Sequence, residues 1–546
     1  MEFNLADLFE SLADSIPERV ALVSGDTRLT FEQLDRRATR FANALRKRGI
    51  GAGDHVGLHL YNGHEFVEAM LGTFKLRAVP INLNYRYVAH ELRYLVDTAD
   101  LVAVVTQAEL AHVVAEASAG IDTVRCVLVV DDGSGATPPR ELEAVDYDTA
   151  LRKASPGRDF GERSGDDLYI IYTGGTTGMP KGVMWRHEDV FFAGLQGGNP
   201  GGDPIESPME LAANAVDEDN AMSILPAAPF IHGAAQWGAL ICLFSGGKLV
   251  LQPGKSFDAV RVCELVAEEQ VNTITLVGDA MAIPIADALS AEGASYDCAS
   301  MFAVASAGAV LSPAVRDRLQ SLLPDAMVLN NFGSSETGHQ GSAFPGEETG
   351  ADGRPSFAMD DTSTVLDENT MQPIEPGSGV IGRVARSGRV PLGYYNDPQK
   401  TAERFVTLDG VRWSIPGDYG TIEPDGRITV YGRGSSCINT GGEKVYPEEV
   451  EEALKAHPDV FDALVVGIAD DKWMQRVAAV VAPRPGKTPT LEALQAHCRD
   501  HIAGYKVPRQ LHLVPTVERS PSGKPNYAWA KQIAGQSGTR SPSTTG

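Results

Sequence analysis

Residues 172–182 read Y-T-G-G-T-T-G-M-P-K-G, and this stretch is the most informative part of the sequence for predicting the fold. Its glycines allow the backbone to approach an anion closely, and successive backbone N–H groups in such a turn form a concave anion site. Its threonines add hydroxyl donors, and Lys181 adds a mobile positive charge. The residues of this predicted phosphate loop are Thr173, Gly174, Gly175, Thr176, Thr177, Gly178 and Lys181.

The residues on either side predict how the loop is held. The apolar run 168–172 predicts a buried strand and residues 185–195 predict a helix, so we expect a strand, the loop and a helix in succession. A Walker-type nucleotide loop would need Ser or Thr directly after its lysine, whereas Gly182 follows Lys181 here. The stretch is therefore not a Walker loop. The plain alternative is a surface turn with one solvated lysine.

The composition is typical of a globular enzyme, with 43% hydrophobic and 22% charged residues. The 546 residues are too many for one core and predict several compact units. A formal net charge of -25 argues against a nucleic-acid partner, because nucleic-acid phosphates require a basic face. A small polyanion would need locally gathered cations. The candidates are Lys181, Arg433, Lys444, Lys506, Arg509 and Lys524.

Cysteine usage and the N-terminal segment predict the cellular location. The six cysteines lie far apart with no C-x-x-C pair, so we expect reduced, inert thiols. The N-terminus lacks the basic region of a secretion signal, and no apolar run approaches the roughly 18 residues that a membrane span requires. These features predict a cytoplasmic protein without an integral membrane segment. Peripheral membrane contact and a homo-oligomer stay open.

The N-terminal part alternates predicted strands with predicted helices. Thr30 followed by Gln33 is a capping box, and apolar residues recur at helical spacing until Gly49. Strands are predicted at residues 56–60, 101–105, 124–130 and 273–277. This alternation predicts mainly parallel sheets covered by helices. Residues 197–220 are rich in Gly, Pro and acids and predict an exposed excursion beside the phosphate loop.

A smaller pattern begins after Arg433. Helices are predicted at residues 448–456 and 490–502, and strands at 463–467, 476–482 and 510–514. About 100 residues is enough for a small α/β domain. The joint at residues 432–440 contains Gly, Ser and Asn rather than packing residues, so it could rotate. The last residues, 535–546, are rich in Gly, Ser and Thr and predict a disordered tail.

Three further loops carry ionisable side chains. Residues 330–338 read N-N-F-G-S-S-E-T-G and contain Glu336, residues 416–420 read P-G-D-Y-G and contain Asp418, and residues 519–527 read R-S-P-S-G-K-P-N-Y and contain Lys524. Each has a plain alternative when taken singly, namely a solvated glutamate, a turn aspartate and a solvated lysine.

Two stretches of small or aromatic residues complete the set. Residues 306–310 read S-A-G-A-V, and such small residues would let a flat base approach closely. His232 lies in A-P-F-I-H-G, where a packed core histidine is as good an interpretation as a pocket residue. Residues 377–382, G-S-G-V-I-G, satisfy the dinucleotide pattern G-x-G-x-x-G. Because Pro373 and Pro376 precede them where a strand should be, we interpret them as a turn.

In this order along the chain, the stretches resemble the signatures of the adenylate-forming superfamily, which contains acyl-CoA synthetases, adenylation domains of peptide synthetases and luciferases. The match runs from about Leu5 to Lys531. The resemblance implies an α/β fold with a large N-terminal domain of stacked mixed sheets and helices, including a small β-barrel part, and a small mobile α+β C-terminal domain. The implied boundaries are 1–434 and 435–533, with a disordered tail at 534–546.

The resemblance also implies roles for individual residues. The catalytic set would be Lys524, Glu336 and Thr173, with Glu336 holding Mg²⁺. The implied contacts to ATP or AMP are Thr173, Gly174, Gly175, Thr176, Thr177, Gly178, Lys181, Ser306, Ala307, Gly308, Asn331, Phe332, Gly333, Ser334, Ser335, Asp418, Arg433 and Lys524. The implied joint and coenzyme A residues are Ser436, Gly441, Gly442 and Lys444, and the implied acyl pocket contains His232, Gly278 and Asp279.

Two departures from the family pattern bear on mechanism and substrate. At the joint, Ser436 and Asn439 replace the usual Asp and Lys, which removes a charge that could bias the two domain poses. Residues 277–280, V-G-D-A, replace a bulkier stretch that contains proline, which predicts a wide acyl pocket. The sequence of this stretch resembles that of ligases of bulky or branched acids, such as actinobacterial steroid side-chain enzymes. Asp279 would be costly to bury unpaired.

The implied reaction is an ATP-dependent ligation in two steps. A carboxylic acid and ATP give an acyl-adenylate and pyrophosphate, and coenzyme A then displaces AMP to give an acyl-CoA thioester. The expected acid is bulky, branched or of medium to long chain. The implied cofactors and co-substrates are ATP, Mg²⁺ and coenzyme A. Three alternatives stay open: a stand-alone adenylating enzyme that passes the acyl group to a carrier protein, a luciferase-like oxygenase, and a non-catalytic acyl-adenylate binding protein.

Overall fold

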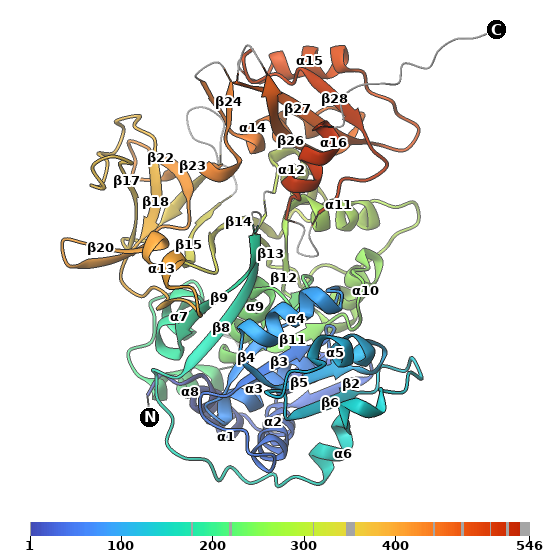
Figure 1. Cartoon of the computed structure of the whole chain (residues 1–546). Coiled ribbons are helices and arrows are strands. Elements are labelled where there is room, and N and C mark those ends of the chain that lie inside the picture. The colour runs from blue at the N-terminus through green and yellow to red at the C-terminus, as the bar shows by residue number, and fades with distance from the viewer. Residues whose placement is uncertain are drawn as a thin grey trace.

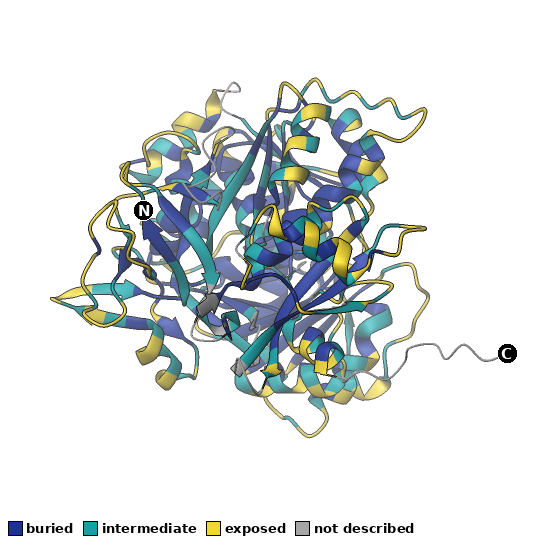
Figure 2. Cartoon of the chain, turned by 90° about the horizontal axis from the view of Figure 1, so that it is seen from above, coloured by how far each residue is buried: buried dark blue, intermediate teal, exposed yellow. Residues whose placement is uncertain are grey.

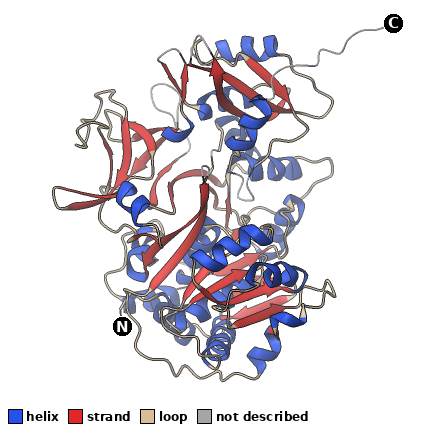
Figure 3. Cartoon of the chain, in the orientation of Figure 1, coloured by secondary structure: helices blue, strands red, loops and turns tan. Residues whose placement is uncertain are grey.

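The computed structural model describes residues 2–175, 178–217, 221–309, 311–344, 355–440, 443–470, 474–502, 504–519 and 524–535. In these ranges the chain forms three sheets with helices packed on them (Figures 1 and 3). Two sheets lie in a large N-terminal unit, which runs from α1 to β23. The third lies in a small C-terminal unit, which begins at β24 and sits over the end of the large one (Figure 1). The predicted α/β fold is confirmed.

The first sheet joins a parallel half to an antiparallel half. Strands pair in parallel from β1 to β14 and antiparallel from β14 onward. Its path is β2 (Thr27–Thr30), β1 (Val20–Ser24), β11 (Lys248–Leu251), β10 (Ser223–Pro226), β12 (Thr273–Leu276), β13 (Ala303–Ala307), β14 (Met327–Ser334), β15 (Gly338–Ala343), β16 (Ser356–Met359), β23 (Ile428–Arg433), β22 (Asp418–Ile422), β18 (Gly382–Arg386), β21 (Val411–Ser414) and β20 (Phe405–Leu408), with β17 (Ser363–Leu366) on β18.

The second sheet carries the predicted phosphate loop at one end of a hairpin. Strands β8 and β9 are antiparallel, whereas the strands from β8 through to β7 pair in parallel. Its order is β19 (Gly393–Tyr394), β9 (Gly178–Arg186), β8 (Leu168–Gly175), β4 (Val79–Asn82), β3 (His55–His59), β5 (Leu101–Gln107), β6 (Cys126–Val130) and β7 (Val145–Asp146).

Helices cover both sheets of the N-terminal unit, and their buried faces form its main core. The capping box is confirmed, because the Gln33 N–H donates to Thr30 Oγ1 while the Thr30 N–H donates to Gln33 Oε1. The helices are α1 (Leu5–Ser15), α2 (Phe31–Arg46), α3 (His64–Lys75), α4 (Ala89–Thr98), α5 (Ala111–Ser118), α6 (Tyr147–Arg152), α7 (His187–Ala193), α8 (Pro208–Val216), α9 (Gly233–Phe244), α10 (Ala259–Glu269), α11 (Gly278–Leu289), α12 (Pro313–Leu322) and α13 (Pro398–Arg404). Figure 2 shows buried strands at the centre with exposed helix faces outside.

The C-terminal unit is a sheet buried on both faces. Its order is β25 (Glu443–Val445), β24 (Ile438–Thr440), β27 (Met474–Pro483) and β26 (Val460–Asp470), with β28 (Gln510–Leu513) on β27. Along β26, Ala463 and Val465 face the core under α14 (Pro447–Lys455) and α15 (Leu491–Arg499), whereas Leu464 and Val466 face α16 (Tyr527–Gly535). Burial on both faces explains the continuous apolar run in this strand. The predicted elements after Arg433 all exist.

The structure corrects two predictions beside the phosphate loop. The segment that follows the loop is a strand up to Arg186, not a helix from residue 185, because Val183 and Trp185 alternate toward the core and the helix begins only at His187. Residues 197–220 are not simply an exposed excursion. They contain α8, whose Leu211 is fully buried, while residues 218–220 lie outside the described part of the chain.

Three smaller predictions have mixed outcomes. The G-x-G-x-x-G stretch is a turn that leads into β18, as expected. Residues 534 and 535, assigned to the tail, end α16, and the remaining tail residues lie outside the described part of the chain. Among the described residues, no helix combines the length and the apolar composition needed to cross a membrane.

Candidate active site

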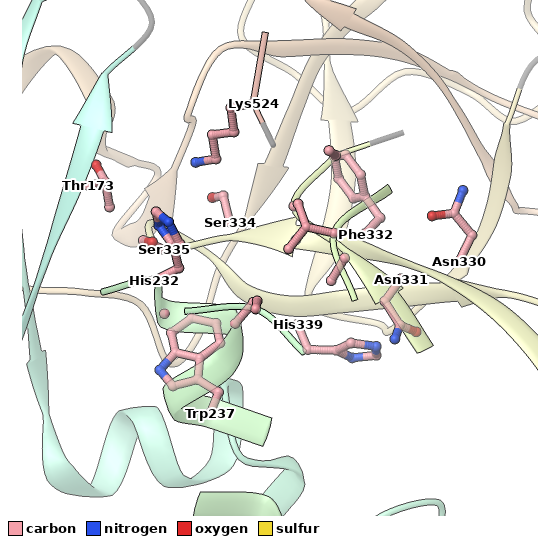
Figure 4. A pocket seen from close by; sticks show the side chains of 18 of the residues that line it. Thr173, His232, Trp237, Asn330, Asn331, Phe332, Ser334, Ser335, His339 and Lys524 are labelled. Carbon is pink, nitrogen blue, oxygen red and sulfur yellow. The ribbon is translucent and has the colours of Figure 1, made fainter. Parts of the chain in front are cut away.

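One cavity of about 1640 Å³ lies between the two units and is lined by residues of both. Its walls include the β8–β9 hairpin, the β14–β15 hairpin, the N-terminal end of α9 and the loop that precedes α16. Figure 4 shows Thr173, Ser334, Ser335 and His232 around the side chain of Lys524. Residues more than 300 positions apart in the sequence therefore meet in one place.

The predicted phosphate loop is the tip of a hairpin rather than the start of a helix. Thr173 lies opposite Lys181 in the ladder, and both line the cavity. Asn82 of β4 anchors this strand, since the Tyr172 N–H donates to Asn82 Oδ1 at 2.8 Å and Asn82 Nδ2 donates to the Tyr172 carbonyl at 2.8 Å. Thr176 and Thr177 lie outside the described residues.

Lys181 is held at the cavity by residues that the sequence did not single out. Its Nζ lies 3.1 Å from Asp397 Oδ2 and 5.2 Å from the centre of the Tyr394 ring. Although burial opposes it, the Lys400 N–H and the Lys181 ammonium together lower the pKa of Asp397 below its ordinary value. The carboxylate therefore stays charged and orients the lysine. The sequence of the phosphate loop does not predict that Asp397 is the partner of Lys181.

Glu336 sits in the turn between β14 and β15, where neighbouring side chains fix it. Its side chain is nearly buried, and the Tyr394 hydroxyl donates to its Oε1 at 3.0 Å. The Ser414 hydroxyl donates to the Glu336 carbonyl at 2.6 Å, and Trp185 Nε1 donates to the Ser335 carbonyl at 2.9 Å. Tyr394 thus contacts both Lys181 and Glu336. A cation and a carboxylate face one cavity from two different hairpins.

Most of the predicted ATP or AMP contacts in residues 306–310 and 330–338 line the cavity. Ala307, Gly308, Asn331, Phe332, Gly333, Ser334 and Ser335 do so. Ser306 does not line it, because its fully buried hydroxyl accepts a hydrogen bond from the Gly278 N–H at 3.0 Å. Gly308 has φ +82°, a backbone conformation that L side chains rarely adopt.

The residues near the joint are only partly described. Asp418 and Ser436 line the cavity, and Asp418 lies opposite Arg433 in the β22–β23 ladder. The side chains of Arg433 and Lys444 are outside the description, as are Gly441 and Gly442. Neither Lys506 nor Arg509 lines the cavity, and Lys506 pairs with Glu449 at 2.5 Å.

Lys524 and His232 line the same cavity, where Figure 4 shows their side chains near each other. His232 precedes α9 and is half-buried, and the loss of solvent around its ring together with the nearby charges of Lys524 and Arg86 lowers its pKa to about 3. The imidazole is therefore neutral at ordinary pH. His232 lines the cavity and is half-buried, so its position fits the pocket interpretation better than that of a fully packed core histidine. Lys181 and Lys524, two of the six predicted cations, line the same cavity.

The remaining wall is apolar and spans the first sheet. Ala303, Ala305 and Ala307 alternate along β13 toward the cavity, and Trp237 and Gly238 of α9 face them. Small side chains on this strand leave a broad trough. The predicted acyl-pocket residue Gly278 is not among the lining residues, although both of its neighbours are.

Asp279 lines the cavity but is not unpaired. Its Oδ2 lies 2.9 Å from Lys455 Nζ, and its Oδ1 accepts hydrogen bonds from the N–H and the hydroxyl of Ser312 at 2.8 and 3.1 Å. The expected cost of burying this charge is therefore offset by Lys455 of α14 and by Ser312, which directly precedes α12.

Comparisons with known proteins show the family of this chain. The family model described as AMP-binding enzyme matches residues 9–395, and the model of the AMP-binding enzyme C-terminal domain matches residues 449–524. A medium/long-chain-fatty-acid–CoA/3-oxocholest-4-en-26-oate–CoA ligase of Mycobacterium marinum is 48% identical over 97% of this chain and 96% of the relative. A 3-oxocholest-4-en-26-oate–CoA ligase of Rhodococcus rhodochrous is 47% identical over 98% and 96%.

Solved structures agree on the fold. The anthranilate CoA ligase AuaEII in complex with anthranoyl-AMP superposes with a TM-score of 0.83 at 21% identity, covering 97% of both chains. ATP-bound MatB from Rhodopseudomonas palustris superposes with a TM-score of 0.79 at 25% identity, covering 97% of this chain and 99% of MatB. The chain belongs to the AMP-binding enzyme family of adenylate-forming enzymes. It is an acyl-CoA ligase that uses ATP.

Proposed function

We propose that this ligase activates bulky, ring-bearing or medium- to long-chain carboxylic acids, forming an acyl-adenylate and then an acyl-CoA thioester. The observation that carries the proposal is one cavity in which a polar wall with Lys181, Glu336 and Asp418 and an apolar alanine-lined wall meet beside Lys524. A triphosphate suits the first wall and a hydrophobic acyl group suits the second. The names of the relatives, which include a steroid side-chain acid, support this substrate class.

In the first step, a carboxylate oxygen of the acid attacks the α-phosphorus of ATP, and pyrophosphate leaves. The Lys524 ammonium lies between the two reacting anions and lowers their repulsion as negative charge builds up. Lys181 and the Thr173 hairpin hold the β- and γ-phosphates, and Asp418 accepts hydrogen bonds from the ribose hydroxyls. Asp397 and Tyr394 keep Lys181 aimed into the cavity.

A magnesium ion fits this wall. Glu336 presents a nearly buried carboxylate whose Oε1 is oriented by the Tyr394 hydroxyl. Among the described residues, no group of three or more His, Cys, Asp or Glu side chains could hold a metal. Mg²⁺ needs few protein ligands, because phosphate oxygens and waters can complete its coordination. The single carboxylate of Glu336 is therefore enough to hold it here. When bound, it would neutralise charge on the triphosphate, and Glu336 would fix its position.

In the second step, the coenzyme A thiolate attacks the acyl carbon, the bond to the phosphate oxygen breaks, and AMP leaves. We propose domains at residues 1–434 and 435–533, and the small one turns about Ser436 between the steps. The turn withdraws Lys524 and brings in the loop with Gly441, Gly442 and Lys444. The location we propose is the cytoplasm, which the six free cysteines support.

A panel of acids tests the proposal. Short fatty, long fatty, branched and steroid side-chain acids are each mixed with ATP and Mg²⁺, and pyrophosphate and acyl-CoA are measured with and without coenzyme A. We expect the long and ring-bearing acids to give both products, with acyl-CoA only when coenzyme A is present. A preference for acids of two to four carbons would contradict the broad trough.

A further inference from the structure

A buried ion pair holds the C-terminal unit against the N-terminal unit. Lys455 is the last residue of α14, and its Nζ lies 2.9 Å from Asp279 Oδ2 in the first turn of α11. The two side chains are only 9% and 7% exposed. Figure 1 shows α14 of the small unit and α11 of the large unit at the place where the units meet.

Each charge is also stabilised within its own unit. A cation in the last turn of a helix and an anion in the first turn both interact favourably with the helix dipole. Asp279 keeps its two hydrogen bonds from Ser312, whose residue precedes α12. Within the C-terminal unit, the Asp462 carboxylate favours the charged form of Lys455, whereas Arg519, which pairs with Asp462 at 2.6 Å, opposes it. The N-terminal unit therefore keeps a satisfied Asp279 even without Lys455.

We infer that Asp279 and Lys455 are positioning residues that select the arrangement in which Lys524 reaches the reacting atoms. The inference rests on the two-step cycle proposed above. Lys455 and Lys524 belong to the same unit, so the contact of α14 with α11 also fixes where Lys524 enters the cavity. Rotation of the small unit must pull Lys455 away from Asp279.

The pair consequently favours one arrangement over the other. An interaction that exists in only one of two arrangements shifts their populations by its own free energy. Exposed pairs contribute little, whereas removing one partner of a buried pair has a large effect. The pair should thus speed adenylation, and its rupture is part of the barrier to the thioester step.

The test separates the two half-reactions in the full-length enzyme. Lys455→Met keeps the apolar stem but removes the charge. We expect pyrophosphate release to fall at least tenfold, mostly in kcat/KM for ATP, while thioester formation from supplied acyl-adenylate and coenzyme A stays unchanged or rises. Lys455→Arg should restore most of the adenylation rate. Fluorescence energy transfer between dyes on the two units should show Lys455→Met in the rotated arrangement more often than the wild type.

Two further variants make the test decisive. Asp279→Asn removes the opposite charge and should give the same imbalance. Lys248→Met breaks a pair with Glu269 that is 3.1 Å long and lies inside the N-terminal unit, and it should leave the ratio of the two half-reactions unchanged. Equal losses in both half-reactions for Lys455→Met and Asp279→Asn, or no loss in either, would overturn the inference. A wild-type enzyme that releases no pyrophosphate with any acid would instead overturn the proposed function.

Discussion

The nucleotide wall and the acyl wall of the cavity are built by different means. On the nucleotide wall, loops at strand ends present Lys181, Glu336 and Asp418, and each needs a particular functional group at a particular place. On the acyl wall, regular strands present small apolar side chains such as Ala305. A wall that binds through polar groups therefore has recognisable sequence motifs. An apolar wall depends only on shape and has few such motifs.

The largest effect should come from the residue where the two walls meet. Lys524→Ala should lower the rate of adenylation by roughly 10²–10³-fold, because a preorganised charge at the developing transition state is lost. Thioester formation from supplied acyl-adenylate should be largely spared. Pyrophosphate release and acyl-CoA formation measure the two steps, with Lys531→Ala on the exposed side of α16 as the control. Equal loss in both steps would remove the two-arrangement model.

A second test addresses the nucleotide wall alone. Glu336→Gln keeps the size of the side chain but removes the charge that we assign to Mg²⁺, so kcat/KM for ATP should fall by about 10²-fold, within the usual range for loss of one transition-state contact. Raising the Mg²⁺ concentration should recover part of the loss. The exposed Glu292→Gln serves as the control. If Glu336→Gln changes kcat/KM for ATP no more than the control does, the carboxylate does not bind the metal.

A third test addresses the acyl wall alone. Ala305→Leu narrows the trough from the sheet side and should cost ring-bearing acids about tenfold in kcat/KM relative to straight-chain acids, since steric differences in apolar pockets are worth about 1–3 kcal/mol. Gly238→Ala on the facing helix should do the same more weakly, because its added methyl would lie in ordinary contact 3.4 Å from Thr275. The measurement is competition between two acids in one reaction. Equal loss for both acids would refute the assignment of this wall.

The smallest expected effect concerns stability at the interface of the two units. Burial raises the pKa of the Glu452 carboxyl to about 7. The folded protein therefore holds this proton more tightly than the unfolded chain. The resulting penalty appears above the unfolded pKa near 4.5 and is complete above about pH 7.

Glu452→Gln should accordingly raise the melting temperature by a few degrees at pH 8 and leave it unchanged near pH 4.5. Scanning calorimetry at the two pH values measures the difference. The exposed Glu492→Gln in α15 should show no such pH dependence. A stabilisation of the same size at both pH values would mean that the carboxyl is not titrating there.

The sequence predicted the local pieces of this molecule better than their long-range partners. The α2 capping box, the alternating strands and the elements of the C-terminal unit follow from patterns over a few residues. The hairpin at the phosphate loop was missed because only Val183 and Trp185 show the alternation of a strand, which is too short a run to distinguish a strand from a helix. Tyr394 and Asp397, which hold Glu336 and Lys181, carry no motif of their own.

Local sequence patterns also predicted two site residues that do not line the cavity. Ser306 was predicted to contact the nucleotide and Gly278 to line the acyl pocket, yet the Gly278 N–H donates to the Ser306 hydroxyl and neither residue lines the cavity. The partner of Asp279 is a lysine 176 positions away in another unit, and no local pattern could indicate it. Which side of a loop faces a cavity is decided by packing between distant strands, and that information is not local.

Transfer of a labelled oxygen tests the central claim most directly. A ring-bearing acid whose carboxylate carries ¹⁸O is incubated with the enzyme, ATP, Mg²⁺ and coenzyme A. Mass spectrometry then measures the ¹⁸O content of each product. Attack of the carboxylate on the α-phosphorus, followed by displacement of AMP, should leave one ¹⁸O in AMP and none in pyrophosphate. Label in pyrophosphate or inorganic phosphate, or acyl-CoA formed with unlabelled AMP, would contradict an acyl-adenylate in this cavity.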